Sequence, residues 1–193
     1  MKKIIVDIDN TLWDFAPVLY VRMKKINPHV TPPSEWELFD FWKSYVIPRE
    51  FYTAIRGIHM DQERFTPYPD AAGFLSSLKE LHLHIIIASH RDKRTLDGTV
   101  NWLNKHNLIF DDIHLSYDKS VLFDDCQVIV DDSPFTLEKA ARSGIIGTGL
   151  KMPWNKDTAH PLFDNLTDVL QFLKKSLVGN PPDEHAQRTN LKM

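Results

Sequence analysis

The sequence predicts an α/β fold: a Rossmann-like core in which helices flank a parallel sheet, with a small helical cap inserted near its start. First, short apolar runs rich in β-branched residues alternate with amphipathic stretches along most of the 193 residues. Second, several of these runs end in acidic or hydroxyl side chains, as strands do where they meet a ligand site. Third, residues 36–65 are rich in aromatic residues and show no convincing strand, which sets this stretch apart from the core.

The first predicted strand is the apolar run at residues 4–6, and Asp7 and Asp9 follow it directly. In open α/β sheets the ligand lies just beyond the carboxyl ends of the strands, so both carboxylates are expected at a site. Two carboxylates this close cannot both be ionised in a dry pocket unless a cation offsets them. A bound Mg²⁺ would supply that cation, while a carboxyl that keeps its proton could act as a general acid. A lone aspartate here would more often cap the next helix, but further polar groups follow the later strands.

The cap, residues 15–65, is expected to be helical. Helices are predicted over residues 12–26, 35–46 and 48–55. Pro28 disfavours continuation of the first helix, Ser34 is a suitable N-cap for the second, and Pro48 fits the first turn of the third. Most aromatic side chains in this segment are expected to pack the cap onto the sheet, because aromatic rings dominate cores by buried area.

Regular alternation resumes in the rest of the core, which is predicted to comprise residues 1–14 and 66–178. Strands are expected at residues 83–88, 113–115, 128–130 and 145–148, the last being the final core strand, and helices at residues 68–81, 92–106, 135–143 and 166–177. Asn165 or Thr167 would cap the final helix. Residues 179–193 are polar, hold two prolines and lack apolar periodicity, so they are predicted to form a tail.

Composition limits the kinds of partner. A formal net charge of -3 with mixed signs argues against an extended nucleic-acid footprint, though not against small anionic ligands. The single cysteine, Cys126, excludes an intrachain disulfide and is expected to pack rather than react. The sequence shows neither a signal-peptide pattern nor an apolar run of membrane-spanning length, and we expect a cytoplasmic protein without a membrane partner.

A set of chemically related side chains follows the predicted strands. Its members are Asp7, Asp9, Ser89, Lys119, Asp131 and Asp132. Carboxylate oxygens are ligands that Mg²⁺ prefers, while a hydroxyl and an ammonium group can bind phosphate oxygens. A lone serine is usually a turn residue and a lone lysine is usually solvated, but the ordered set favours a site for a phosphoryl group and a hard cation.

In four ordered motifs the chain resembles the haloacid dehalogenase-like (HAD) hydrolases. The motifs are residues 7–11, Ser89, Lys119 and the pair Asp131 and Asp132. The resemblance implies that Asp7 is the nucleophile, which takes the phosphoryl group as an aspartyl-phosphate. Asp9 would give a proton to the leaving group and take one from the attacking water. Ser89 and Lys119 would bind the transferring phosphoryl group, and their neighbours Asn10 and His90 are candidates for the same role.

The resemblance also implies Mg²⁺ as cofactor, held by Asp132, Asp7 and the backbone carbonyl of Asp9. Asp131 is expected to lie beside these ligands, and the order of Asp131 and Asp132 stays open. An aspartate at position 9 separates the phosphatase-like members of the family from the dehalogenases, which have no alkoxide to protonate. We therefore reject a dehalogenase and expect an Mg²⁺-dependent phosphomonoesterase.

Within that family, the chain is similar to the 5'(3')-deoxyribonucleotidases and their bacterial relatives. The similarity lies in residues 36–51, 65–71 and 117–120. In those proteins a compact helical cap presents aromatic residues to the base of a nucleoside monophosphate, and stacking contributes roughly 1–3 kcal/mol per base. The resemblance implies a substrate of this class and a stacking role for some rings of the cap. The candidates are Phe15, Trp36, Phe39, Trp42 and Phe51.

Departures from these patterns keep other substrates open. Asn10 stands where a glycine is common, and residues 88–91 lack the usual proline after the phosphate-site serine. Residues 9–13 and 88–91 are also similar to the magnesium-dependent phosphatases. The alternatives are a phosphatase of a sugar phosphate, a phosphoprotein or a nucleic-acid end, and a non-catalytic binding protein with the HAD fold. A binding protein has little need for charged groups at several strand ends, which favours an enzyme.

Overall fold

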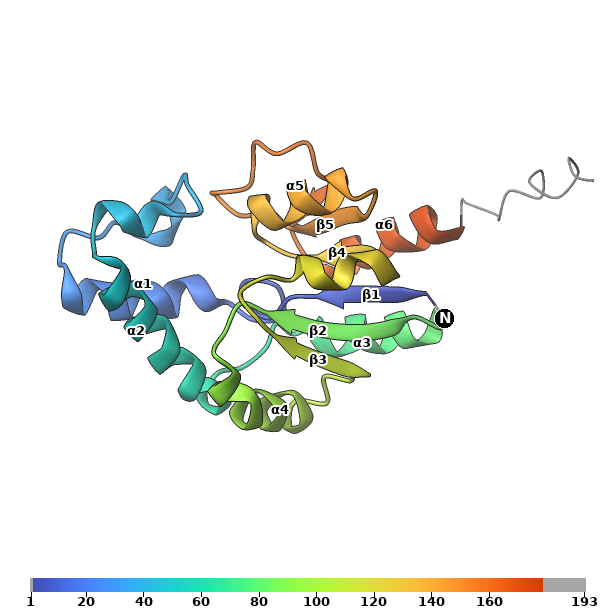
Figure 1. The fold of residues 1–193 in the computed structure, drawn as a ribbon, viewed down its shortest axis with the longest axis horizontal. Coiled ribbons are helices and arrows are strands. Elements are labelled where there is room, and N and C mark those ends of the chain that lie inside the picture. Colours follow the sequence, from blue (N-terminus) through green and yellow to red (C-terminus); the bar gives the residue numbers. More distant parts are fainter. Residues whose placement is uncertain (1, 179–193) are drawn as a thin grey trace, which may run out of the picture.

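The computed structural model describes residues 2–178, which form a six-stranded parallel sheet with helices on both faces (Figure 1). The strands are β1 (Lys3–Val6), β2 (His84–Ser89), β3 (Asp112–Leu115), β4 (Cys126–Val130), β5 (Ile146–Leu150) and β6 (Leu162–Phe163). Their order across the sheet is β3-β2-β1-β4-β5-β6, so the first strand of the chain lies between β2 and β4. The α/β fold with a parallel sheet, as predicted, is confirmed.

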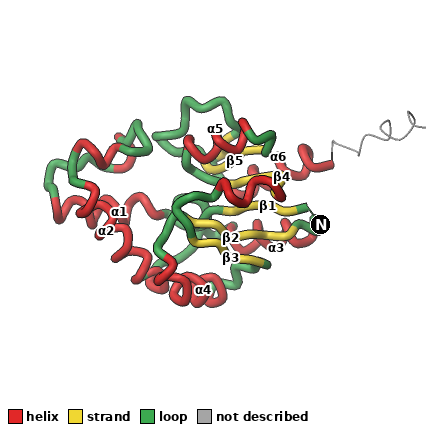
Figure 2. The backbone as a smooth tube through the Cα atoms, viewed as in Figure 1, coloured by secondary structure: helices red, strands yellow, loops and turns green. Residues whose placement is uncertain are grey.

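The described residues form six α-helices, and those that pack on the sheet form a layer on each face. The six helices are α1 (Phe15–Ile26), α2 (Pro48–Met60), α3 (Ala71–Glu80), α4 (Leu96–Lys105), α5 (Pro134–Arg142) and α6 (Leu166–Val178). Because side chains alternate along a strand, Ile4 and Val6 of β1 pack in the core cluster that contains residues of α3 and α6. Ile5 packs on the opposite face, in the cluster that contains Leu137 of α5. Figure 2 shows the sheet between these layers.

Helices α1 and α2 lie beyond the carboxyl ends of the strands, at the left in Figure 1, and the N-terminus lies at the opposite end of the sheet. The loops that leave β1, β2 and β4 therefore run between the sheet and this helical segment. The predicted polar site residues lie in these loops, at the last residue of β2 (Ser89) and after β3 (Lys119), so the fold directs them toward one region.

The segment between α1 and α2 differs from the prediction. The expected helix at residues 35–46 is wrong, since two short 3-10 helices, Pro33–Glu35 and Phe41–Ser44, stand there. The Trp36 ring stacks on Phe41 with 3.7 Å between ring centroids, and Trp42 stacks on Phe51 at 4.2 Å. The Trp36 ring also lies 6.2 Å from that of Trp154, and packing of this kind overrides the local preference for a regular helix.

Other element boundaries shift less. Helix α2 continues to Met60 rather than ending at residue 55, and its last turn is buried at Ile58 and His59. The strand expected at residues 145–148 is not the final one, because β6 follows it with only two residues, too few to give a sequence pattern. Asn165 caps α6 by accepting a hydrogen bond at Oδ1 from the backbone N–H of Asp168, at 2.8 Å.

Three further 3-10 helices connect the core elements, at Gln62–Arg64, Lys93–Thr95 and Ser120–Asp125. The predicted tail, residues 179–193, lies outside the described residues. Within the part of the chain that the structure describes, every helix is too short or too polar to cross a membrane.

Candidate active site

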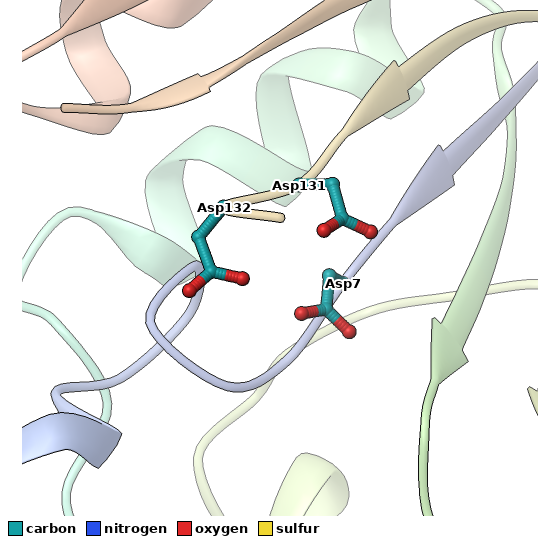
Figure 3. Close-up of side chains that lie close together, drawn as sticks. All are labelled: Asp7, Asp131 and Asp132. Atoms are coloured by element: carbon teal, nitrogen blue, oxygen red, sulfur yellow. The ribbon is translucent and has the colours of Figure 1, made fainter. Parts of the chain in front are cut away.

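An acidic cluster forms where β1 and β4 end side by side. The backbone N–H of Asp7 donates to the carbonyl oxygen of Val130 at 2.9 Å, which continues the pairing of the two strands by one residue. Asp7 thereby lies next to Asp131 and Asp132, and one carboxylate oxygen of each lies within 4.8 Å of the other two. Figure 3 shows the three carboxylates facing one another. All three residues are buried, with at most 5% of their surface exposed.

Lys119 is the cation of this cluster. Its Nζ lies 2.6 Å from Asp7 Oδ1 and 2.6 Å from Asp131 Oδ2, and the residue is 3% exposed. Burial alone would lower the pKa of the ammonium group, but the charges of Asp131 and Asp7 outweigh it and raise that pKa. Lys119 therefore stays charged and offsets part of the negative charge.

One ammonium group does not balance three carboxylates. Burial raises the pKa of Asp7 to about 7, because the charge of Lys119 only partly opposes burial and the charge of Asp131. Burial and the charges of Asp131 and Asp7 also hold the pKa of Asp132 well above its usual range. Among the described residues Asp7 Oδ1 makes no aligned hydrogen bond, although it lies close to Lys119. The cluster offers only oxygen atoms as metal ligands, and Lys119 balances only part of its negative charge. Both features fit a hard divalent cation such as Mg²⁺.

The two neighbouring aspartates differ in their contacts. Asp131 uses both carboxylate oxygens, since Oδ2 meets Lys119 and Oδ1 accepts a hydrogen bond from the backbone N–H of Ser133 at 2.8 Å. Asp132 Oδ2 accepts a hydrogen bond from Asn10 at 2.9 Å. Within the described residues, Asp132 Oδ1 forms no hydrogen bond to the protein, so this carboxylate keeps an oxygen for a ligand.

Asn10 connects the cluster to α1. Its Nδ2 donates to Asp132, while its Oδ1 accepts from the backbone N–H of Ala16 at 2.9 Å. The residue has a φ of 54°, in the left-handed region that asparagine tolerates better than most residues other than glycine. This backbone conformation explains why asparagine can stand where the resemblance has glycine. The side-chain amide of Asn10 orients Asp132, and its contact with phosphate stays a prediction.

Two residues that the sequence analysis did not select hold the backbone of the aspartate pair. Asn155 is fully buried and donates from Nδ2 to the carbonyl oxygens of Asp132 and Leu150, both at 3.0 Å. Gly149 lies against Asp131 so closely that a side chain would not fit. A glycine inside a strand is a signal of close backbone approach, whereas Asn155 stands in a loop without a recognisable motif.

Asp9 lies beside the acidic cluster and is held by three donors. Its Oδ1 accepts hydrogen bonds from Trp13 Nε1 at 2.9 Å and from Arg91 Nη2 at 2.7 Å, and its Oδ2 lies 2.9 Å from His59 Nε2. Burial alone would raise the pKa of Asp9, but Arg91 and His59 outweigh it and hold the pKa well below its usual range. Asp9 is therefore ionised. Because an ionised carboxylate only accepts hydrogen bonds, Nε2 of His59 carries a hydrogen.

Arg91 joins Asp9 to the predicted phosphate-binding hydroxyl. Its guanidinium is fully buried, and Nε donates to Ser89 Oγ at 3.0 Å. The remaining contacts run from Nη1 to Gln62 Oε1 at 3.3 Å and to Thr99 Oγ1 at 3.1 Å. Since Ser89 Oγ accepts this bond, its own O–H can point elsewhere. Arg91 is not among the site residues expected from the sequence, although a charged residue just after a buried strand is a usable signal.

A cavity of about 890 Å³ connects these groups to the helical segment. Every residue that the sequence analysis assigned to the site lines it. Its lining combines the carboxylates, Ser89 and Lys119 from the core with aromatic side chains of residues 15–65. The volume is within the range of small-molecule sites. His90 is exposed at the wall of the cavity.

The aromatic candidates are not equally accessible. Trp36 is 2% exposed, and Trp42 and Phe51 are each 8% exposed and stack on one another. Phe15 lies in the first turn of α1, next to the His59 ring. Phe39 is partly exposed and contacts Phe135 of α5 edge-on, at 5.9 Å between centroids.

No protein-family model and no curated protein matches the sequence. Similar solved structures include a HAD hydrolase of family IA, variant 3, from Entamoeba histolytica, with a TM-score of 0.64, 13% identity, and coverage of 93% of this chain and 100% of that chain. A predicted phosphatase from Clostridium acetobutylicum has a TM-score of 0.64 and 17% identity, with coverage of 90% and 98%. An L-2-haloacid dehalogenase has a TM-score of 0.52 and 12% identity, with coverage of 90% and 99%. At such identities the likeness concerns the fold, so the chain has the fold of the HAD hydrolases, which hosts more than one chemistry.

Proposed function

We propose that this chain is a metal-dependent phosphomonoesterase that works through an aspartyl-phosphate. The observation that carries the proposal is the buried cluster of Asp7, Asp131 and Asp132 around Lys119, at the strand ends and open to a ligand-sized cavity. Phosphoryl transfer depends mainly on positioning and on neutralising charge, and this cluster supplies both. Asp9 at the same cavity favours a phosphatase over a dehalogenase, because halide release needs no proton donor.

Asp7 acts as the nucleophile. One of its oxygens attacks phosphorus, the bond from phosphorus to the leaving oxygen breaks, and an aspartyl-phosphate forms. A water molecule then attacks phosphorus, the bond to the Asp7 oxygen breaks, and inorganic phosphate leaves. Lys119 and the Ser89 hydroxyl bind the phosphoryl oxygens throughout, with charge-assisted hydrogen bonds where Lys119 is the donor.

A divalent cation would be held by Asp7, Asp132 and the backbone carbonyl of Asp9. It would neutralise charge on the phosphoryl group. We assign Asp132 rather than Asp131 as the direct ligand, because both carboxylate oxygens of Asp131 already contact Lys119 and Ser133. Asp131 then fixes the ammonium group, and Asn10 and Asn155 fix Asp132. Mg²⁺ suits this set of oxygen donors best.

Asp9 moves the protons. In its ionised form it accepts a proton from the attacking water during hydrolysis of the aspartyl-phosphate. The negative charge of an entering phosphate raises the pKa of a nearby carboxyl, which allows Asp9 to carry the proton that the leaving oxygen takes up. Arg91 and His59 hold this carboxylate at the cavity wall.

The substrate class we favour is the nucleoside monophosphates. Residues 15–65 serve as the cap in this proposal, and several of their aromatic rings line the same cavity as Asp7. A base stacked there would contribute roughly 1–3 kcal/mol with little dependence on its identity. Phe39 is the ring best suited to this role, because it is partly exposed and the aromatic ring of Phe135 meets it at an edge, although Phe39 also packs against the core cluster.

Phosphate release from a panel of phosphomonoesters with Mg²⁺ tests the function. The panel includes deoxynucleoside monophosphates, sugar phosphates, a phosphopeptide and a 5'-phosphorylated oligonucleotide. We expect turnover that EDTA suppresses and that Asp7→Asn abolishes, with deoxynucleoside monophosphates preferred. Asp124→Asn, which changes an exposed aspartate near β4, is the matched control and should keep full activity. Robust turnover by Asp7→Asn would remove the nucleophile, and preference for another ester would remove the nucleotidase assignment alone.

A further inference from the structure

The geometry points to His59 as a positioning residue for Asp9, and we propose this role on the basis of the function proposed above. His59 Nε2 lies 2.9 Å from Asp9 Oδ2. Elsewhere in the described chain, Oδ2 has no hydrogen-bond partner, while Oδ1 is held by Trp13 and Arg91. His59 is thus the group that fixes the second oxygen and with it the rotation of the carboxylate.

Arg91, which holds the other carboxylate oxygen of Asp9, is rigid. Arg91 is 1% exposed, and its guanidinium is fastened by Ser89, Gln62 and Thr99 as well as by Asp9. A guanidinium with so many fixed donors cannot follow the carboxylate if it turns. Loss of His59 would therefore leave Asp9 pivoting about a single fixed oxygen.

His59 comes from the helical segment rather than from the core. It stands in the last turn of α2, is 2% exposed, and packs beside the Phe15 ring at 5.7 Å between centroids. Gln62, three residues later, is also buried and contacts Arg91. The end of α2 therefore contacts Asp9 through His59, and the 3-10 helix after it contacts Arg91 through Gln62. The placement of the segment that lines the cavity thus also sets the orientation of Asp9.

This role has a chemical signature that a purely structural role lacks. A carboxyl group transfers a proton only when it stands within hydrogen-bond distance of the reacting oxygen and points at it. An alkoxide leaving group needs that proton as the ester bond breaks, whereas p-nitrophenolate leaves readily without one. The ratio kcat/KM reports the steps up to release of the leaving group. Misplacing Asp9 should therefore lower kcat/KM for an alkyl phosphate much more than for p-nitrophenyl phosphate.

The test compares glycerol 2-phosphate with p-nitrophenyl phosphate in His59 variants of the full chain. His59→Phe keeps a ring but removes the N–H, and His59→Leu removes the ring as well. An effect that both variants share comes from the missing N–H and not from poor packing of one replacement side chain. We expect kcat/KM for glycerol 2-phosphate to fall about tenfold to a hundredfold, part of the roughly 10²–10⁴-fold that a positioned acid contributes. The value for p-nitrophenyl phosphate should change less than threefold, which also shows that the variant is folded.

Two further variants sharpen the comparison. His59→Gln can present an amide N–H to Asp9 and should restore most of the lost kcat/KM. His29→Phe makes the same change at an exposed histidine of the same segment and should leave both substrates unaffected.

The outcomes separate this inference from the proposed function. Equal losses on both substrates, or no loss on either, overturn the positioning role while the phosphatase stands. Wild-type protein that releases phosphate from neither substrate, nor from any ester of the panel, overturns the phosphatase and the role of His59 with it.

Discussion

Gly149 and Asp131 lie so close together that a Cβ atom at position 149 would meet the carbonyl oxygen of Asp131 at 2.1 Å. No side-chain rotation relieves this contact, because the atom approached belongs to the backbone. Strand β5 can therefore pair with β4 in its present register only with glycine at this position, and two of the three clustered carboxylates follow β4 directly.

Gly149→Ala should destabilise the protein and disturb the acidic cluster. Forcing β5 and β4 apart is expected to cost about 1–3 kcal/mol, the usual range for an overpacked core. Thermal unfolding measures this loss. Gly98→Ala is the matched control, since a Cβ atom there meets nothing within 4 Å and the position is helical. That change should stabilise the protein by roughly 0.5–1 kcal/mol. Equal unfolding midpoints for the two variants would contradict the close approach of Gly149 to Asp131.

Asn155→Ala should weaken the hold on Asp132. The substitution leaves two buried carbonyl oxygens, those of Asp132 and Leu150, without their donor. An unsatisfied buried acceptor costs about 1–3 kcal/mol, so we expect a clear fall in the unfolding midpoint and weaker binding of Mg²⁺. Asn104→Ala, at an exposed position of α4, should stay within about 0.5 kcal/mol of wild type. A normal Mg²⁺ affinity in Asn155→Ala would show that the loop does not position Asp132.

Mg²⁺ should stabilise the folded chain. A ligand present at 100 times its dissociation constant contributes about 2.7 kcal/mol when it binds only the folded state. We expect the unfolding midpoint to rise with Mg²⁺ concentration, and Asp132→Asn to abolish this rise. Asp131→Asn should only reduce it, because Asp131 acts through Lys119. Titrating each variant with Mg²⁺ in a thermal-shift assay ranks the variants by how much stabilisation they lose, with Asp124→Asn as the control. The reverse order for Asp131 and Asp132 would assign the direct ligand to Asp131.

The placement of these carboxylates could be predicted from the sequence because it follows from topology. Apolar runs before Asp7 and before Asp131 predict strands, and parallel strands bring their carboxyl ends to one edge of a sheet. The strand order then makes β1 and β4 neighbours. The positions of Lys119 and Ser89 could be predicted for the same reason, since each follows a predicted strand.

The partners of these residues could not be predicted in the same way. His59 lies 50 positions from Asp9 in the sequence, and Asn155 lies 23 positions from Asp132. Neither residue is marked by hydrophobic periodicity or by a sequence motif, because a single long-range hydrogen bond has no signature in the neighbouring sequence. The helix expected at residues 35–46 failed for a related reason, since Trp36 packs on Trp154, far along the chain, at 6.2 Å between ring centroids.

Cys126 should be an unreactive thiol. Burial raises its pKa to about 11, so the thiolate, which is the reactive form, is scarce at neutral pH. We expect slow labelling by a disulfide reagent in the folded protein, with a rate that rises about tenfold per pH unit between pH 7 and 9. Unfolding in denaturant should make the labelling rapid. A rate that levels off below pH 9 would contradict the raised pKa.

Phe39→Leu should change substrate preference with little effect on a generic ester. If the base stacks on this ring, its loss removes roughly 1–3 kcal/mol of binding, which lowers kcat/KM for a deoxynucleoside monophosphate about fivefold to a hundredfold or more. Glycerol 2-phosphate has no ring to stack and should be hydrolysed as by wild type. Leu38→Ala changes the adjacent residue, which is 66% exposed, and should alter neither substrate.

Trp36 and Trp42 are expected to behave differently from Phe39. Both are buried and stacked on other rings of the segment, so Trp36→Ala or Trp42→Ala should cost about 3–5 kcal/mol of stability and lower activity on every ester alike. Parallel measurement of unfolding midpoints and of kcat/KM on both substrates distinguishes the two kinds of aromatic residue. A Trp42→Ala protein that keeps its stability but loses nucleotide turnover selectively would contradict this expectation. Trp42 would then not be needed for core packing, and the stacking surface for the base would be the pair of Trp42 and Phe51.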